Sequence, residues 1–208
     1  MIKNIIFDFD GVILDSIPVK TEAFRKLFEK FPKEKVSELI EFHIENGGMS
    51  RYKKIEYFFT IILNREINEI EVLKYAKKYS KITKEELTQS KYLIKDCINF
   101  IKQNYQNYNL HIASGADEQD LLYICKELDL TQYFLSIHGS PVVKNEIVAK
   151  ILLENKYKKI ETRLIGDSIN DYEAANANEI EFYGYNNKKL EKRHKYISMF
   201  KGWQKYEI

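Results

Sequence analysis

The stretch that decides the fold is "NIIFDFDGVILDS", residues 4–16. It begins as an apolar run typical of a buried strand, yet it contains Asp8, Asp10 and Asp15 and no His or Lys. Asp8 and Asp10 are two residues apart, so on a strand both would point to one side and need a compensating partner there. Asp15 has the character of a turn residue. The stretch therefore predicts a strand that ends in an acidic functional site.

Composition and charge set the broad class of the protein. With 208 residues, 44% of them hydrophobic, the chain can bury a packed core as one domain or as one domain with an insert. The net charge of +2 predicts no nucleic-acid partner. The segment "NNKKLEKRHKYISMFKGWQKY", residues 186–206, is basic and contains aromatic residues. We interpret it as a solvated helix face rather than a nucleic-acid or anionic-surface site.

The two cysteines and the apolar runs indicate the compartment. Cys97 and Cys125 belong to no Cys-x-x-Cys pair, which favours buried thiols in a reducing environment. The apolar start is interrupted by acids and lacks a cleavage site, and no apolar run is long enough to span a bilayer. We therefore expect a cytoplasmic protein with no membrane partner.

Two sequence patterns alternate along the chain, most clearly over residues 96–185. Short apolar runs that end in Gly, Ser or Asp predict strands near residues 4–11, 109–116, 135–140, 162–168 and 179–186. The segments "EQDLLYICKELDL", residues 118–130, and "VVKNEIVAKILLENKY", residues 142–157, have helical spacing. This alternation predicts an α/β fold, a Rossmann-like parallel sheet with helices on both faces.

Residues 18–87 break this rhythm, because they contain four amphipathic segments and no convincing strand. They are best interpreted as an all-helical domain inserted after the first strand. We expect a core domain of residues 1–16 and 88–208, and an inserted domain of residues 17–87.

Polar residues follow the predicted strands at the edge where ligands bind in open parallel sheets. Asp8 and Asp10 close the first strand, Ser114 the second and Asp167 that of residues 162–166, with Lys144 following another. Taken singly, Ser114 and Asp167 could also be caps or turn formers, Lys144 a surface lysine, and Asp171 a first-turn acid. Together, crowded carboxylates require a cation, and oxygen ligands with one lysine suit Mg²⁺ and a phosphate.

The motifs "DFDGVILDS", "ASGA", Lys144 and "GDSIND", in this order, resemble those of the haloacid dehalogenase superfamily of Mg²⁺-dependent phosphohydrolases. The helical insert resembles that superfamily's first type of cap domain, as in phosphoglycolate phosphatases and β-phosphoglucomutases. The resemblance implies a metal site of Asp8, Asp10, Asp167 and Asp171, in which Asp10 contributes its backbone carbonyl.

The same resemblance implies the catalytic roles. Asp8 would be the nucleophile that forms an aspartyl-phosphate, and Asp10 the general acid and base. Ser114 would donate a hydrogen bond to the transferring phosphoryl group, and Lys144 would neutralise its charge. Gly11 and Gly115 would lie against the phosphate.

The inserted domain carries a second candidate feature, "HIENGGMSRYKK", residues 43–54. Glycines after one helix and Ser50 before the next form an ordinary helix–helix turn. Alternatively the turn faces the crevice, where Gly48 and Arg51 would contact the remote end of the substrate, since a guanidinium binds carboxylate or phosphate in a bidentate manner. His43 is interpreted as a partly buried helix histidine.

The favoured hypothesis is a Mg²⁺-dependent phosphatase of a small phosphorylated metabolite, such as a sugar phosphate or phosphoglycolate, acting as a monomer or weak homodimer. One alternative is a sugar-phosphate mutase of the same superfamily. Another is a receiver-like module that accepts phosphate on an aspartate without turnover. The long insert and the second acid, Asp10, weigh against the receiver.

Overall fold

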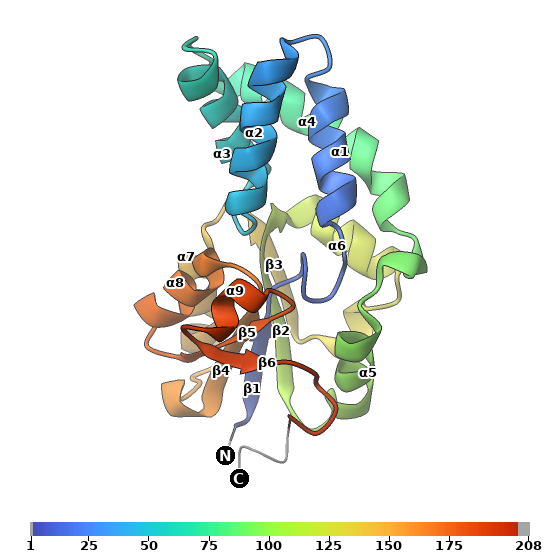
Figure 1. Ribbon diagram of the computed structural model, residues 1–208. Helices are drawn as coiled ribbons and strands as arrows, with labels where there is room; N and C mark the ends of the chain where they lie inside the picture. The colour runs from blue at the N-terminus through green and yellow to red at the C-terminus, as the bar shows by residue number, and fades with distance from the viewer. Residues whose placement is uncertain (1, 204–208) are drawn as a thin grey trace.

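The computed structural model describes residues 2–203, which form a parallel sheet flanked by helices and a separate group of helices above it (Figure 1). The sheet has the order β3-β2-β1-β4-β5-β6, and every neighbouring pair is parallel. Its strands are β1 (Asn4–Phe7), β2 (Asn109–Asp117), β3 (Ser136–Ser140), β4 (Thr162–Gly166), β5 (Glu181–Tyr185) and β6 (Lys195–Ile197). The predicted Rossmann-like sheet is confirmed.

Helices cover both faces of the sheet because the strands are apolar on both sides. In β1, Ile5 and Phe7 pack into one core cluster and Ile6 into another, as the alternation of a strand requires. The first cluster includes residues of α5 (Lys95–Asn104) and α6 (Glu118–Glu127). The second includes residues of α7 (Lys144–Glu154), α8 (Ile169–Ala177) and α9 (Lys188–Glu191). Single 3₁₀ turns occur at Ser90–Tyr92, Thr131–Tyr133 and Lys159–Glu161.

The insert after β1 is all-helical, as predicted. Its helices are α1 (Ile17–Leu27), α2 (Lys33–Glu45), α3 (Arg51–Tyr57) with a π-helical turn at Phe58–Ile62, and α4 (Glu69–Leu87). These helices bury a core of their own in which Phe24, Phe28 and Phe58 are almost fully buried. We call this group of helices the cap. Its boundaries at residues 17 and 87 stay a prediction.

The two connections between the cap and the sheet run side by side. Asp15 N donates to Tyr92 O at 2.8 Å, and Ile94 N donates to Ile13 O at 3.0 Å. Leu14 and Leu93 form an antiparallel bridge between these contacts. The chain therefore leaves the core and returns to it at one place.

The basic C-terminal segment differs from its prediction. Within the described residues 186–203, the α-helical part is Lys188–Glu191, and Lys195–Ile197 forms β6, a short edge strand that the sequence did not reveal. Phe200 and Trp203 are buried, with their rings 4.8 and 5.5 Å from that of Phe100. The aromatic residues of this segment therefore belong to the core, and its interpretation as a solvated helix face is wrong. Residues 204–206 of the segment lie outside the described residues.

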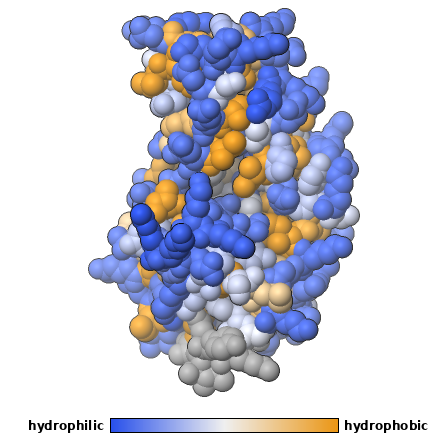
Figure 2. All heavy atoms as spheres, in the orientation of Figure 1, coloured by the Kyte–Doolittle hydropathy of each residue, from blue (hydrophilic) through white to orange (hydrophobic). Residues whose placement is uncertain are grey.

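The surface and the cysteines complete the description. Figure 2 shows a mostly hydrophilic face with hydrophobic side chains visible between the cap helices and between the cap and the core. Within residues 2–203, no helix combines the length and the apolar character needed to cross a membrane. Cys97 and Cys125 are both buried and unpaired.

Candidate active site

The sheet brings the predicted acids to one edge. Asp8 directly follows β1, and its N–H continues the ladder by donating to Ile165 O at 2.9 Å. Asp167 directly follows β4, the neighbour of β1, as predicted. β2 differs, because it continues to Asp117 past an irregularity after Ala113. The expectation that Ser114 closes that strand is therefore wrong, although its buried hydroxyl lies near the same edge and accepts a bond from Ala116 N at 3.1 Å.

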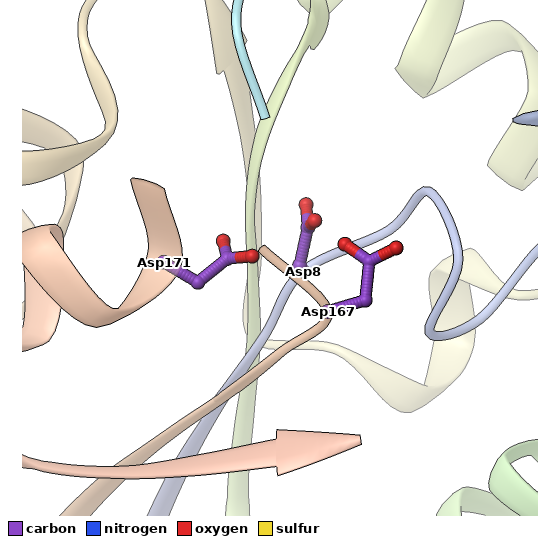
Figure 3. Close-up of side chains that lie close together, drawn as sticks. All are labelled: Asp8, Asp167 and Asp171. Carbon is purple, nitrogen blue, oxygen red and sulfur yellow. The ribbon is translucent and has the colours of Figure 1, made fainter. Parts of the chain in front are cut away.

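Three carboxylates converge at this edge, as Figure 3 shows, with Asp8 between Asp171 and Asp167. One oxygen from each lies within 4.8 Å of the others. Asp8 is only 2% exposed and Asp171 is fully buried. Such a cluster is costly without a cation, because the charges repel one another and have lost most of their hydration.

Lys144, the first residue of α7, supplies one positive charge. Its Nζ lies 2.8 Å from Asp8 Oδ1 and also pairs with Asp171 Oδ1. Burial alone would lower the pKa of Lys144, but the charges of Asp171 and Asp8 raise it well above its usual value. The lysine is thus fixed in its protonated form beside the Asp8 carboxylate.

Both carboxylate oxygens of Asp171 accept hydrogen bonds from neighbouring residues. Its Oδ2 accepts bonds from Ser168 Oγ at 2.6 Å and from Ser168 N at 3.0 Å, and the bond from Ser168 N belongs to a capping box at the start of α8. Its Oδ1 accepts the bond from Lys144. By contrast, the Asp167 carboxylate has no hydrogen bond or ion pair within residues 2–203. Asp167 and the second oxygen of Asp8 are therefore the groups open to a cation.

The pKa values of these acids support a cation site. Burial raises the pKa of Asp8 to about 7, with a further contribution from Asp171 that Lys144 partly offsets. Burial and the charges of Asp8 and Asp171 raise the pKa of Asp167 well above its usual value. A hard divalent cation would relieve both effects, and carboxylate oxygens are the ligands that Mg²⁺ prefers. The donor set present fits that ion.

Gly11 is required by the close packing of this site. Its φ is +78°, in the left-handed region, and an added Cβ would lie 2.1 Å from Asp167 Oδ2. Asn186 Nδ2 donates to Gly11 O at 3.0 Å, and Asn187 Nδ2 donates to Asp167 O at 2.7 Å. These two asparagines were not identified from the sequence. Their only signal was an Asn-Asn pair at the carboxyl end of a predicted strand.

Asp10 has partners of its own. Because β1 ends at Phe7, strand alternation does not extend to Asp10, and the expectation of one shared set of partners for Asp8 and Asp10 is wrong. Ser16 Oγ and Lys20 Nζ each donate to the Asp10 carboxylate at 2.5 Å. Burial would raise the pKa of Asp10, but Lys20 and Ser16 lower it on balance. Ser16 and Lys20 were missed because a polar residue at the start of a helical insert resembles a surface residue.

Comparison with known proteins gives the family. The family model for "Haloacid dehalogenase-like hydrolase" matches residues 5–185, which include every residue of the site described above except Asn186 and Asn187. The chain belongs to this family. This haloacid dehalogenase-like hydrolase has no significant match among curated proteins.

Solved structures share the whole fold of the hydrolase. β-Phosphoglucomutase from Clostridium difficile is 17% identical, with a TM-score of 0.78 over 98% of this chain and 93% of that one. A predicted phosphoglycolate phosphatase from Haemophilus somnus is 14% identical, with a TM-score of 0.75 over 100% and 98%. A putative hydrolase of the family from Bacillus subtilis, solved with magnesium, is 18% identical, with a TM-score of 0.73 over 99% and 98%. These structures share the fold, and the chain is a hydrolase of this family with a candidate aspartate metal site.

The turn between α2 and α3 of the hydrolase lies directly against the core. A Cβ added at Gly115 would lie 2.1 Å from the carbonyl oxygen of Gly48. A Cβ added at Gly48 would lie 2.9 Å from Ser168 Oγ. The segment is thus a helix–helix turn that also lies against the core, and its contact with a substrate stays a prediction. The two glycines let the cap and the core touch through their backbones.

Arg51, the first residue of α3, joins the cap to α6. Its Nη1 lies 2.5 Å from Asp120 Oδ2, and its Nη2 lies 3.2 Å from Asp117 Oδ2. The hydroxyl of Tyr52 also donates to Asp117. Burial would lower the pKa of Arg51, but Asp120 and Asp117 raise it. In this arrangement the guanidinium bridges the two domains, and its predicted contact with a substrate stays a prediction.

Proposed function

We propose that the protein is a Mg²⁺-dependent phosphatase that hydrolyses a small phosphorylated metabolite, a sugar phosphate or a phosphoglycolate-like acid, through an aspartyl-phosphate on Asp8. The observation that supports this most directly concerns the Asp8 carboxylate, which lies 2.8 Å from Lys144 Nζ and next to Asp167 (Figure 3), a carboxylate without an ion pair or hydrogen bond within residues 2–203. The lysine would orient the Asp8 carboxylate for attack on phosphorus.

The proposed reaction has two displacements. An Asp8 oxygen forms a bond to phosphorus while the ester oxygen leaves and takes a proton from Asp10, which would have to be released from its ion pair with Lys20 and protonated for this step. Water then attacks the phosphoryl group, gives a proton to Asp10, and releases phosphate and free Asp8. Lys144 and Ser114 would stabilise the charge on the phosphoryl oxygens.

Magnesium would be held by the side chains of Asp8 and Asp167 and the backbone carbonyl of Asp10, with Asp171 in support. When bound, it supplies positive charge for the phosphoryl oxygens. Asp171 would act mainly by orienting Lys144, since both of its oxygens already accept hydrogen bonds. The substrate side of the crevice would comprise Gly11, Gly48, Arg51 and Gly115.

The first test is phosphate release from p-nitrophenyl phosphate and from a panel of phosphorylated metabolites. We expect steady turnover with Mg²⁺ and none after EDTA treatment. A single burst of phosphorylation without turnover would instead identify a phospho-acceptor module. Absence of both across the panel would contradict the proposal.

A sugar-phosphate mutase is the second candidate, because the fold matches that of a β-phosphoglucomutase over nearly the whole chain. Incubation with β-glucose 1-phosphate separates the two activities. Inorganic phosphate as the product indicates hydrolysis, whereas glucose 6-phosphate indicates transfer.

Removal of the metal should make stability depend on pH through Asp8. Its folded pKa of about 7 exceeds the unfolded value of 3.8, so the stability contributed by its protonated form is complete below pH 3.8 and is lost as the pH rises through about 7. With EDTA present, we expect the Tm of the wild type to fall more between pH 5 and pH 8 than that of Asp8→Asn. Mg²⁺ should restore the wild-type Tm at pH 8. Parallel Tm curves for the two proteins would contradict this expectation.

Arg51→Ala is expected to raise KM. The change removes the cation that joins α3 to Asp117 and Asp120 at the margin of the crevice, and with it any contact to the substrate. Steady-state kinetics with the best substrate of the panel measure the effect, which should be about 10-fold or more for a charged, partly buried contact. An unchanged KM would remove Arg51 from the substrate side of the site.

A further inference from the structure

Lys54 on α3 is a buried lysine that has no ion-pair partner among residues 2–203. The residue is 2% exposed, and the hydrogen-bond partners of its Nζ in the described part of the chain both belong to His43, with Nδ1 at 2.9 Å and the carbonyl oxygen at 3.3 Å. No carboxylate within residues 2–203 forms an ion pair with it. A buried ammonium in such surroundings is costly, and proteins keep such groups where a binding partner completes them.

His43 adds a second unsatisfied group at the same place. Burial and the neighbouring Lys54 lower its pKa to about 3, so the ring is neutral. With Nδ1 accepting from Lys54, the single ring proton belongs on Nε2. That Nε2 is buried and has no hydrogen-bond partner among the described residues. Among the described residues, the Nε2–H of His43 therefore has no acceptor, and the Nζ of Lys54 has no carboxylate partner.

Both residues line the cavity between the cap and the core, together with Asp10. Two other cations line it, Lys20 and Arg51, and both are already paired, with Asp10 and with Asp120 and Asp117 respectively. Lys54 lies close enough to the catalytic edge for the charges of Asp10 and Asp167 to affect its pKa, which burial and Lys20 lower to about 7. Among the described residues that line this cavity, Lys54 is the basic side chain without an ion pair, so a substrate anion can pair with it directly.

We propose that Lys54 and His43 bind a second anionic group of the substrate, so that the natural substrate is a phosphomonoester that also carries a carboxylate or a second phosphate. The inference rests on the phosphatase activity proposed above. An anion at this place would pair with the ammonium and accept the bond from His43 Nε2. Arg51, which the sequence favoured for this role, would then act in joining the domains.

The test uses two matched pairs of substrates that differ in the second anion. 2-Phosphoglycolate is compared with 2-hydroxyethyl phosphate, and glucose 1,6-bisphosphate with glucose 1-phosphate. We expect the wild type to prefer the doubly anionic member of at least one pair in kcat/KM. The pair that shows the preference identifies the second anion as a carboxylate or a phosphate.

Lys54→Met removes the charge and keeps an unbranched apolar chain for packing. It should lower the ratio of kcat/KM, doubly anionic over singly anionic, by about 10- to 100-fold, the loss typical of a charged hydrogen bond. The matched control is Lys53→Met, the exposed neighbour on the same helix, which should leave the ratio unchanged. Arg51→Ala should raise KM for both members of a pair alike.

Several results would overturn the inference. These are a wild type without preference in either pair, or a Lys54→Met protein that loses activity equally with both members. The comparison of the paired substrates with the wild-type protein tests the inference even if the Lys54→Met variant fails to fold. Hydrolysis of p-nitrophenyl phosphate in the same preparation shows which proposal has failed. If hydrolysis is absent, the proposed phosphatase activity is wrong. If hydrolysis occurs without a preference for the second anion, only the proposed role of Lys54 is wrong.

Discussion

Asp8→Asn is expected to abolish steady phosphate release, with a fall in kcat of at least about 1000-fold, because an amide cannot form the covalent intermediate. Burial raises the pKa of Asp8 to about 7, so the substitution also removes a carboxylate that destabilises the metal-free fold at neutral pH. The variant should therefore fold well, and the loss of activity will not reflect unfolding. The measurement is phosphate release with Mg²⁺, accompanied by a Tm from circular dichroism.

Asp15→Asn is the matched control for this variant. Asp15 belongs to the same opening stretch, but it is exposed where the chain leaves the core for the cap. We expect it to retain wild-type turnover. Residual activity of Asp8→Asn above a few per cent, after exclusion of wild-type contamination, would show that Asp8 is not the nucleophile.

Gly115→Ala is expected to lower kcat/KM by about 100-fold without unfolding either domain. The new Cβ would lie 2.1 Å from the carbonyl oxygen of Gly48, a backbone atom that cannot rotate away. The turn before α3 must therefore move, and with it the cap residues that face the crevice. Displacements of about 1 Å cost activity on this scale when they misplace reacting groups.

Gly47→Ala serves as the control on the same turn. A Cβ there would meet only Ser168 Cβ, at 3.9 Å, an ordinary contact. This variant should keep its activity, since the turn need not move. Equal activity of Gly115→Ala and Gly47→Ala would show that the backbone contact between Gly48 and Gly115 is not needed for turnover.

The sequence predicted the fold because its two periodicities are local. Of the six strands in residues 2–203, five contain apolar runs that the sequence shows, and the helices between them have amphipathic repeats. β6 was missed because it has three residues and begins with an exposed lysine, so it has neither the length nor the apolar pattern of a strand. The burial of Phe200 and Trp203 depends on the distant helix α5 and left no local signal.

The candidate site was predicted mainly where strand ends define it, and Lys54 was missed where the cap meets the core. Asp8, Lys144, Asp167 and Asp171 could be anticipated, since parallel strands place their ends together. Nothing in the local sequence "RYKK", residues 51–54, distinguishes Lys54 from a solvent-exposed lysine. Its burial requires the packing of α2 and the closure of the cap on α6. The partners of Arg51 are likewise more than 60 residues away in sequence.

The paired connections at Asp15 and Tyr92 bear on how such an architecture can change in evolution. The chain leaves and rejoins the core at neighbouring residues, so the whole cap is equivalent to one loop whose two ends are held together at the sheet. The entropy of closing a loop grows slowly with its length, by only about 0.6 kcal/mol for each doubling. The segment between these residues can therefore lengthen, shorten or be exchanged at little cost to the catalytic sheet, so the specificity of the enzyme can diverge while its chemistry is preserved.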